Sequence, residues 1–75
     1  MRWQTPRKNQ GQMVTVSYCW DNCMLYRRTT DASDRSVLVE FAMLSLLDDT
    51  VELPEDFAGI DAFDDTQITW TACGF

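Results

Sequence analysis

A chain of 75 residues is long enough for one domain, and a domain of this size buries only about 60% of the surface that its unfolded form exposes. A hydrophobic fraction of 45%, with three Trp, two Tyr and four Phe, is ample for a packed core and excludes a wholly disordered protein. No apolar run approaches the roughly 18 residues that span a bilayer, and no apolar signal region follows Met1, so we expect a soluble, cytoplasmic protein.

Charge is divided unevenly along the sequence. All six basic residues lie between Arg2 and Arg35, where they outnumber three acids, whereas Ser36–Phe75 carries nine acids and no base. The whole chain has a net charge of −6. Such a partition bears on the choice of binding partner rather than on the fold.

The first twelve residues differ from the rest of the chain. They mix Pro6 and Gly11 with polar and basic side chains, and they show neither strand nor helix periodicity. We therefore expect a basic, flexible arm over residues 1–12 and a single domain over residues 13–75.

A β-hairpin is predicted directly after this arm. Met13–Trp20 alternates as a half-buried strand does, and Cys23–Thr29 resumes an extended pattern. Asp21 and Asn22 between them tolerate the backbone geometry of a tight turn.

The register of the hairpin decides where two cysteines lie. A loop of Asp21 and Asn22 pairs Trp20 with Cys23, and its core face comprises Tyr18, Trp20, Cys23 and Leu25. A loop that also includes Trp20 places Cys19 opposite Cys23, and its core face comprises Val16, Tyr18, Met24 and Tyr26. The sequence does not choose between these two registers.

A long helix is predicted over Asp31–Asp49. The segment begins with Asp31 and Ser33, which can cap a helix, and continues through good helix formers. Within it, Val37, Leu38 and Val39 would also suit a strand. Its apolar residues cover nearly the whole circumference of such a helix, so Val37–Leu47 needs cover from a second helix, a homodimer or another chain.

A short acidic helix and a final strand complete the predicted fold. Pro54 can open the helix, in which Phe57, Ile60 and Phe63 follow one stripe. Gln67–Cys73 then alternates as a strand. The predicted class is α+β, in the order β-β-α-α-β, with the helices on one face of a small sheet.

The residue types present favour neither a metal site nor a catalytic centre. Cys19, Cys23 and Cys73 have the wrong spacing for structural zinc, and the chain has no His as a further ligand. Three cysteines without a secretion signal are typical of free thiols in an apolar core. Without His, a Gly-rich phosphate loop or a nucleophile elbow, we expect no enzyme and no cofactor.

The strongest functional pattern is an acidic segment over residues 48–65. Eight carboxylates lie within these 18 residues, interleaved with apolar side chains, and this combination suits a basic partner protein. The predicted partner-binding residues are Asp48, Asp49, Glu52, Glu55, Asp56, Phe57, Asp61, Asp64 and Asp65. An acidic surface that only keeps a small domain soluble explains the same pattern equally well.

A second hypothesis assigns function to the basic half. The arm and hairpin would form a nucleic-acid-binding surface through Arg2, Arg7, Lys8, Arg27 and Arg28, with aromatic side chains available for stacking on bases. The nine acids that follow would repel a phosphate backbone unless they pointed well away from it.

The predicted function is therefore noncatalytic: a small acidic inhibitor or regulator of a basic, nucleic-acid-handling protein. Compact accessory proteins of phages or mobile elements have this size and acidity, which is an analogy at the level of class. A small structural subunit of a homo- or hetero-oligomer, completed through Val37–Leu47, is a further alternative. No interaction with a membrane is expected.

Overall fold

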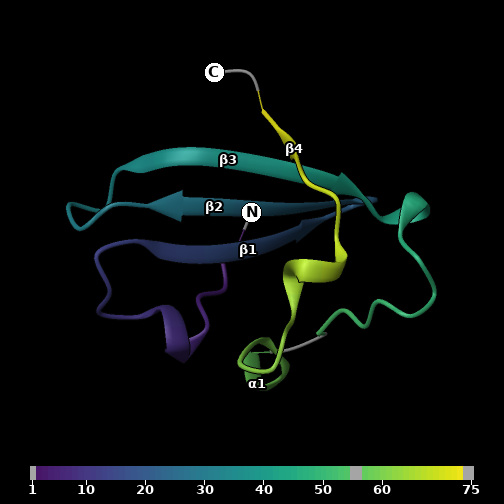
Figure 1. Ribbon diagram of the computed structural model, residues 1–75, viewed down its shortest axis with the longest axis horizontal. Helices are drawn as coiled ribbons and strands as arrows, with labels where there is room; N and C mark the ends of the chain where they lie inside the picture. The colour runs from purple at the N-terminus through teal and green to yellow at the C-terminus, as the bar shows by residue number, and fades with distance from the viewer. Residues whose placement is uncertain (1, 55–56, 74–75) are drawn as a thin grey trace.

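The computed structural model describes residues 2–54 and 57–73 and contains one antiparallel sheet of four strands in the order β1–β2–β3–β4 (Figure 1). The strands are β1 Thr15–Asp21, β2 Met24–Thr30, β3 Ser36–Met43 and β4 Thr71–Ala72. The other elements are η1 Arg7–Asn9, η2 Leu44–Leu46, α1 Phe57–Ile60 and η3 Asp65–Gln67. The predicted α+β class is wrong, because the described residues contain no helix longer than the four residues of α1. No helix in this part of the chain has the length and apolar content needed to cross a membrane.

The predicted hairpin is confirmed, but in a register that neither alternative gave. Asp21 pairs with Met24, so the loop consists of Asn22 and Cys23, and Cys19 lies opposite Tyr26. The backbone at Asn22 has a φ of 58°, the positive value that two-residue hairpin loops need at their first residue and that Asn tolerates. Cys23 is consequently exposed in the turn and takes no part in a core face.

The helix predicted over Asp31–Asp49 is absent. Asp31 closes a turn instead, with its Oδ1 accepting a hydrogen bond from the N–H of Arg35 at 3.0 Å. A side chain that can cap a helix can equally stabilise such a turn. The chain then pairs along β2 as β3, in which β-branched Val37 and Val39 are favoured. The apolar helix Val37–Leu47, for which a second helix, a homodimer or another chain was the expected cover, is therefore replaced by β3 and η2.

The second predicted helix is also wrong, because only the single turn α1 forms. Gly59 within it disfavours helix by about 1 kcal/mol relative to Ala. Glu55 and Asp56, which belong to the predicted helix, lie outside the described residues. The final strand is shorter than the predicted Gln67–Cys73, since β4 has two residues, which pair with β3.

One face of the sheet is covered by an irregular segment. After β3 the chain passes around one end of the sheet, reaches α1 and returns across that face to bring β4 beside β3 (Figure 1). We call residues 44–54 and 57–70 the covering layer. Its buried side chains pack against those of the sheet in one cluster: Tyr18, Leu25, Ala42, Ile60, Phe63 and Ile68.

The residues near the N-terminus lie beside β1. Gln4 forms two backbone hydrogen bonds with Tyr18, of 2.7 and 2.8 Å, and so extends the sheet beyond β1. The hydroxyl of Thr5 lies 2.7 Å from that of Ser17, and Pro6 is fully buried. These contacts fix the N-terminal residues beside the sheet, within the segment predicted as an arm.

Candidate functional site

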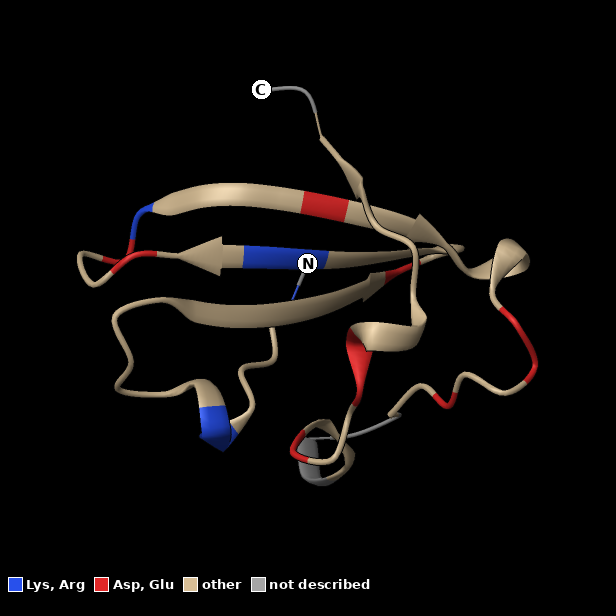
Figure 2. Ribbon diagram, viewed as in Figure 1, with Lys and Arg blue, Asp and Glu red and all other residues tan. Residues whose placement is uncertain are grey.

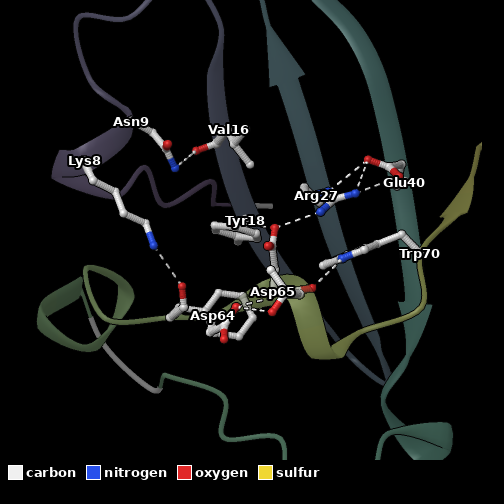
Figure 3. Close-up of polar contacts among 11 residues, drawn as sticks. Lys8, Asn9, Val16, Tyr18, Arg27, Glu40, Asp64, Asp65 and Trp70 are labelled. Atoms are coloured by element: carbon white, nitrogen blue, oxygen red, sulfur yellow. Dashed lines mark hydrogen bonds and ion pairs between the residues drawn. The ribbon is translucent and has the colours of Figure 1, made fainter.

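At the centre of the sheet, the guanidinium of Arg27 lies between two carboxylates (Figure 3). Its Nε and Nη2 donate to the two oxygens of Glu40, both at 2.9 Å, across β2 and β3. Its Nη1 donates to Oδ2 of Asp65 at 2.8 Å. None of these three side chains is more than 21% exposed, so solvent and salt screen the ion pairs less than pairs on the surface.

Asp65 joins this group to the covering layer. Its Oδ2 also accepts a hydrogen bond from the hydroxyl of Tyr18 at 2.7 Å, and its backbone carbonyl accepts one from Nε1 of Trp70 at 3.3 Å. The Trp70 ring centroid lies 4.5 Å from the guanidinium carbon of Arg27, a cation–π contact. We call these five residues the Arg27 clamp: Tyr18, Arg27, Glu40, Asp65 and Trp70.

Two groups of the clamp, Arg27 and Tyr18, have raised pKa values. Burial opposes the charge of Arg27, but the hydrogen bonds to Asp65 and Glu40 outweigh this effect and raise the pKa of Arg27. Burial, followed by the hydrogen bond to Asp65, raises the pKa of Tyr18 well above its ordinary value. The Tyr18 phenol therefore stays neutral, and the Arg27 guanidinium pairs with both carboxylates, so the clamp cross-links the sheet and the covering layer.

Two bases of the predicted nucleic-acid surface lie beside the covering layer, although the Arg7 side chain remains 88% exposed. The backbone N–H of Arg7 donates to Oδ1 of Asp61 at 2.7 Å, and the Arg7 Nε lies 3.9 Å from Oδ2 of the same side chain. Nζ of Lys8 donates to the carbonyl of Phe63 at 3.1 Å (Figure 3).

The remaining bases of that predicted surface are dispersed. The guanidinium carbon of Arg28 lies 4.3 Å from the ring centroid of Trp3. Neighbouring residues of a strand point to opposite faces, so Arg28 and Arg27 cannot share a surface. Arg2 is exposed. The structure therefore does not gather the five predicted bases into one groove.

The predicted partner-binding acids fall into two groups. Asp61 and Asp65 are tied to bases within the molecule. Four others are exposed and form no ion pair within the described residues: Asp48, Asp49, Glu52 and Asp64. We call these four the acidic rim. Glu55 and Asp56 lie outside the described residues, and Phe57 is described only as the first residue of α1.

The acidic rim follows the covering layer, whereas the bases lie next to the N-terminus, in η1, on β2 and near the turn between β2 and β3 (Figure 2). In the loop after η2, apolar side chains point toward the core and acidic side chains point toward solvent. Val51 and Leu53 pack against the buried cluster, while Asp49 and Glu52 are exposed. Oδ1 of Asp48 accepts a hydrogen bond from the N–H of Thr50 at 3.1 Å, which fixes the start of the loop.

Asp64 has a further role as the N-cap of η3. Its Oδ1 accepts hydrogen bonds from the backbone N–H of Thr66 at 3.0 Å and from the Thr66 hydroxyl at 2.7 Å. These hydrogen bonds lower the pKa of Asp64, and the charge of Lys8 acts in the same direction. The Asp64 carboxylate therefore remains ionised to a lower pH than an ordinary Asp.

Two grooves open beside the acidic rim. The first has a volume of about 460 Å³ and lies between residues 50–54 and 59–67. Its lining includes Val51, Leu53, Pro54, Phe63, Glu52 and Asp64. We call it the Phe63 groove. The second groove, of about 420 Å³, is lined by Asp48 and Leu46, and Gln67 borders both grooves.

The three cysteines are free thiols in three different environments. Cys19 is buried, Cys23 is exposed and Cys73 is intermediate. In the part of the chain that the structure describes, no three Cys, Asp or Glu side chains form a group able to hold a metal ion.

Sequence reasoning missed the Arg27 clamp, although its central pair had a detectable signal. Arg27 and Glu40 are direct cross-strand partners, and opposite charges at such positions stabilise a sheet. The pair becomes visible only when Ser36–Met43 is assigned as a strand. The contacts to Tyr18 and Trp70 depend on the path of the covering layer, which has no periodicity to detect.

We compared the chain with protein-family models, with curated proteins and with solved structures. None of the three comparisons finds a match for this chain.

Proposed function

We propose that this protein is a noncatalytic binding module, a small acidic inhibitor or regulator of a basic, nucleic-acid-handling partner protein. The proposal rests on an asymmetry of available charge. Three bases make close side-chain contacts within the molecule, namely Lys8, Arg27 and Arg28, whereas the Arg7 side chain is 88% exposed. The four carboxylates of the acidic rim are exposed and have no ion pair within the described residues. Uncompensated negative charge attracts a cationic surface and speeds the encounter with it.

The packing of the residues that carry the acidic rim also favours binding. Val51 and Leu53 pack beside the buried cluster, and the Arg27 clamp fastens the covering layer to β1, β2 and β3. Carboxylates on a segment that is already held in place lose less conformational freedom on binding than carboxylates on a loose chain. The three free thiols support a reducing, cytoplasmic setting.

The test is affinity capture from native cell extract with three baits. The rim bait carries Asp48→Asn, Asp49→Asn and Glu52→Gln. The control bait carries Asp21→Asn, Asp31→Asn and Asp34→Asn, which change the net charge equally but lie at the two hairpin turns. Circular dichroism and thermal unfolding must first show that all three baits are folded.

We expect the wild type and the control bait to capture the same basic protein, and added salt to release it because the contact is electrostatic. The rim bait should not capture it. Equal capture by the rim bait would refute the proposal and leave the acids with a role in solubility alone. Capture of nucleic acid in place of a basic protein would support the basic surface instead.

A further inference from the structure

The Phe63 groove joins an apolar interior to the acidic rim. Its volume of about 460 Å³ lies in the range of roughly 300–1,000 Å³ that is usual for ligand pockets. Phe63 itself is only 4% exposed and is held by Tyr18, whose ring meets it edge-on at a centroid distance of 4.9 Å. The base of the groove therefore belongs to the packed core and does not need to form on binding.

Two carboxylates of the acidic rim also line the groove. Glu52 stands on the side of residues 50–54 and Asp64 on the side of residues 59–67. Oδ1 of Asp64 is occupied by Thr66, but Oδ2 accepts no hydrogen bond from the described residues. The groove thus combines apolar walls with two negative charges and with a carboxylate oxygen that can accept a further hydrogen bond. A long cationic side chain with an apolar stem would complement both its walls and its charge.

We infer that the Phe63 groove receives an arginine side chain of the basic partner. The stem would pack against Val51, Leu53 and Phe63, and the guanidinium would donate to Glu52 and Asp64. This inference rests on the proposed function, because it names the group by which the acidic rim recognises its partner. The partner must then present a side chain that fits the groove, which attraction between charges alone does not require.

Arginine fits this groove better than lysine for two physical reasons. A guanidinium is more weakly hydrated than an ammonium, so less hydration is lost when apolar walls surround it. It also presents a planar set of five donors that can reach carboxylates on two sides, whereas the ammonium of lysine is a compact point charge. Recognition through this groove should therefore distinguish the two basic side chains.

A titration followed by NMR tests the inference on the full chain. The probes are acetyl-Gly-Arg-Gly-amide, the lysine analogue and the citrulline analogue, the last having nearly the shape of arginine without its charge. We expect the arginine peptide to shift the amide resonances of Val51, Ala62 and Gln67, with the other two peptides at least about five-fold weaker. Equal binding by lysine, or shifts confined to Asp48 and Asp49, would overturn the inference.

A variant that fills the groove without removing charge provides the matched control. Ala62 is exposed and lines the groove, so Ala62→Phe should weaken the arginine peptide at least about five-fold, while Ala32→Phe in the turn before β3 should not. Unchanged binding by folded Ala62→Phe would refute the inference. If that variant fails to fold, the pair Glu52→Gln and Asp64→Asn replaces it, with the same expected loss and the same refuting result.

The same variant separates this inference from the proposed function. In the capture experiment, Ala62→Phe keeps every carboxylate of the acidic rim. Loss of the partner by the rim bait but not by Ala62→Phe would refute the arginine site and leave the proposed function standing. Equal capture by the rim bait would refute the proposed function, while the peptide titration would still decide whether the groove binds arginine.

Discussion

The hydroxyl of Tyr18 donates a hydrogen bond of 2.7 Å to Asp65, although 47 residues separate the two in the sequence. The accepting oxygen, Oδ2, also accepts from Arg27 at 2.8 Å. One carboxylate oxygen thus fastens the covering layer to β1 and to β2. A layer with so little regular secondary structure depends on such contacts, because its own backbone hydrogen bonds are few.

Removing the Asp65 carboxylate should strongly destabilise the fold. Asp65→Ala leaves the partly buried charge of Arg27 with one partner and the Tyr18 hydroxyl with none, and such losses cost about 3 kcal/mol. Asp49→Ala, on the exposed acidic rim, should stay within about 0.5 kcal/mol of the wild type. Urea denaturation measures both free energies of unfolding, and equal values would contradict a structural role for the clamp.

The hydrogen bond of Tyr18 also predicts a dependence on alkaline pH. The pKa of Tyr18 lies above its ordinary value of 10.0 in the folded protein, so the folded state holds this proton more tightly than the unfolded state. The resulting stabilisation is complete below pH 10.0 and is lost as the pH rises toward the folded pKa.

Tyr18→Phe removes the ionisable group and keeps the ring. The stability difference between wild type and variant should therefore shrink by about 1 kcal/mol between about pH 9 and about pH 11. Urea denaturation of both proteins at each pH measures it. Any other group that titrates in this range acts on both proteins and cancels, so a constant difference would show that the Tyr18 proton is not held by the fold.

Ile60 tests whether the covering layer and the sheet form one core. Its side chain is fully buried, so Ile60→Ala should cost about 2–5 kcal/mol through lost burial and a residual cavity. In a domain of this size such a loss consumes much of the total stability. Val37→Ala, at a position 60% exposed, is the control and should change little. Similar melting temperatures for the two variants would argue that the layer is only loosely attached.

The hairpin register can be checked through the cysteines. With a loop of Asn22 and Cys23, the thiol of Cys23 is exposed and that of Cys19 is buried. Iodoacetamide should modify Cys23 first, whereas Cys19 should react only after denaturant unfolds the chain. Samples taken at successive times are digested, and mass spectrometry then measures the extent of modification of each cysteine separately. Early labelling of Cys19 would contradict this register.

The hairpin was predictable from the sequence because its signal is local. Alternation from Val16 to Trp20 and turn-forming residues act over a few positions, and no distant contact overrides them. β3 was not predictable in the same way, because Asp31 resembles a helix cap and Leu38–Leu47 contains good helix formers. Pairing with β2 decided the outcome, and that contact is not visible in the segment itself.

The site was predictable only as a region. Sequence reasoning selected the acidic segment, but it could not separate carboxylates that face solvent from those that bind bases inside the molecule. Asp61 and Asp65 are used internally, by Arg7 and Arg27, because the chain folds its basic half onto its acidic half. The Phe63 groove was equally hidden, since its two sides come from separate parts of the covering layer.

The strands follow the same order in the sheet as in the chain, and this order bears on the sequence of events in folding. The first three strands are joined by short turns, so their pairings close at small entropic cost, whereas β4 arrives only after the whole covering layer. We expect the layer to form last, and in the rare openings of the native state we expect its amides to exchange hydrogen faster than those of β2. A partner bound to the acidic rim would stabilise the closed state of the covering layer. Binding should therefore be measurable as slower amide hydrogen exchange across that layer.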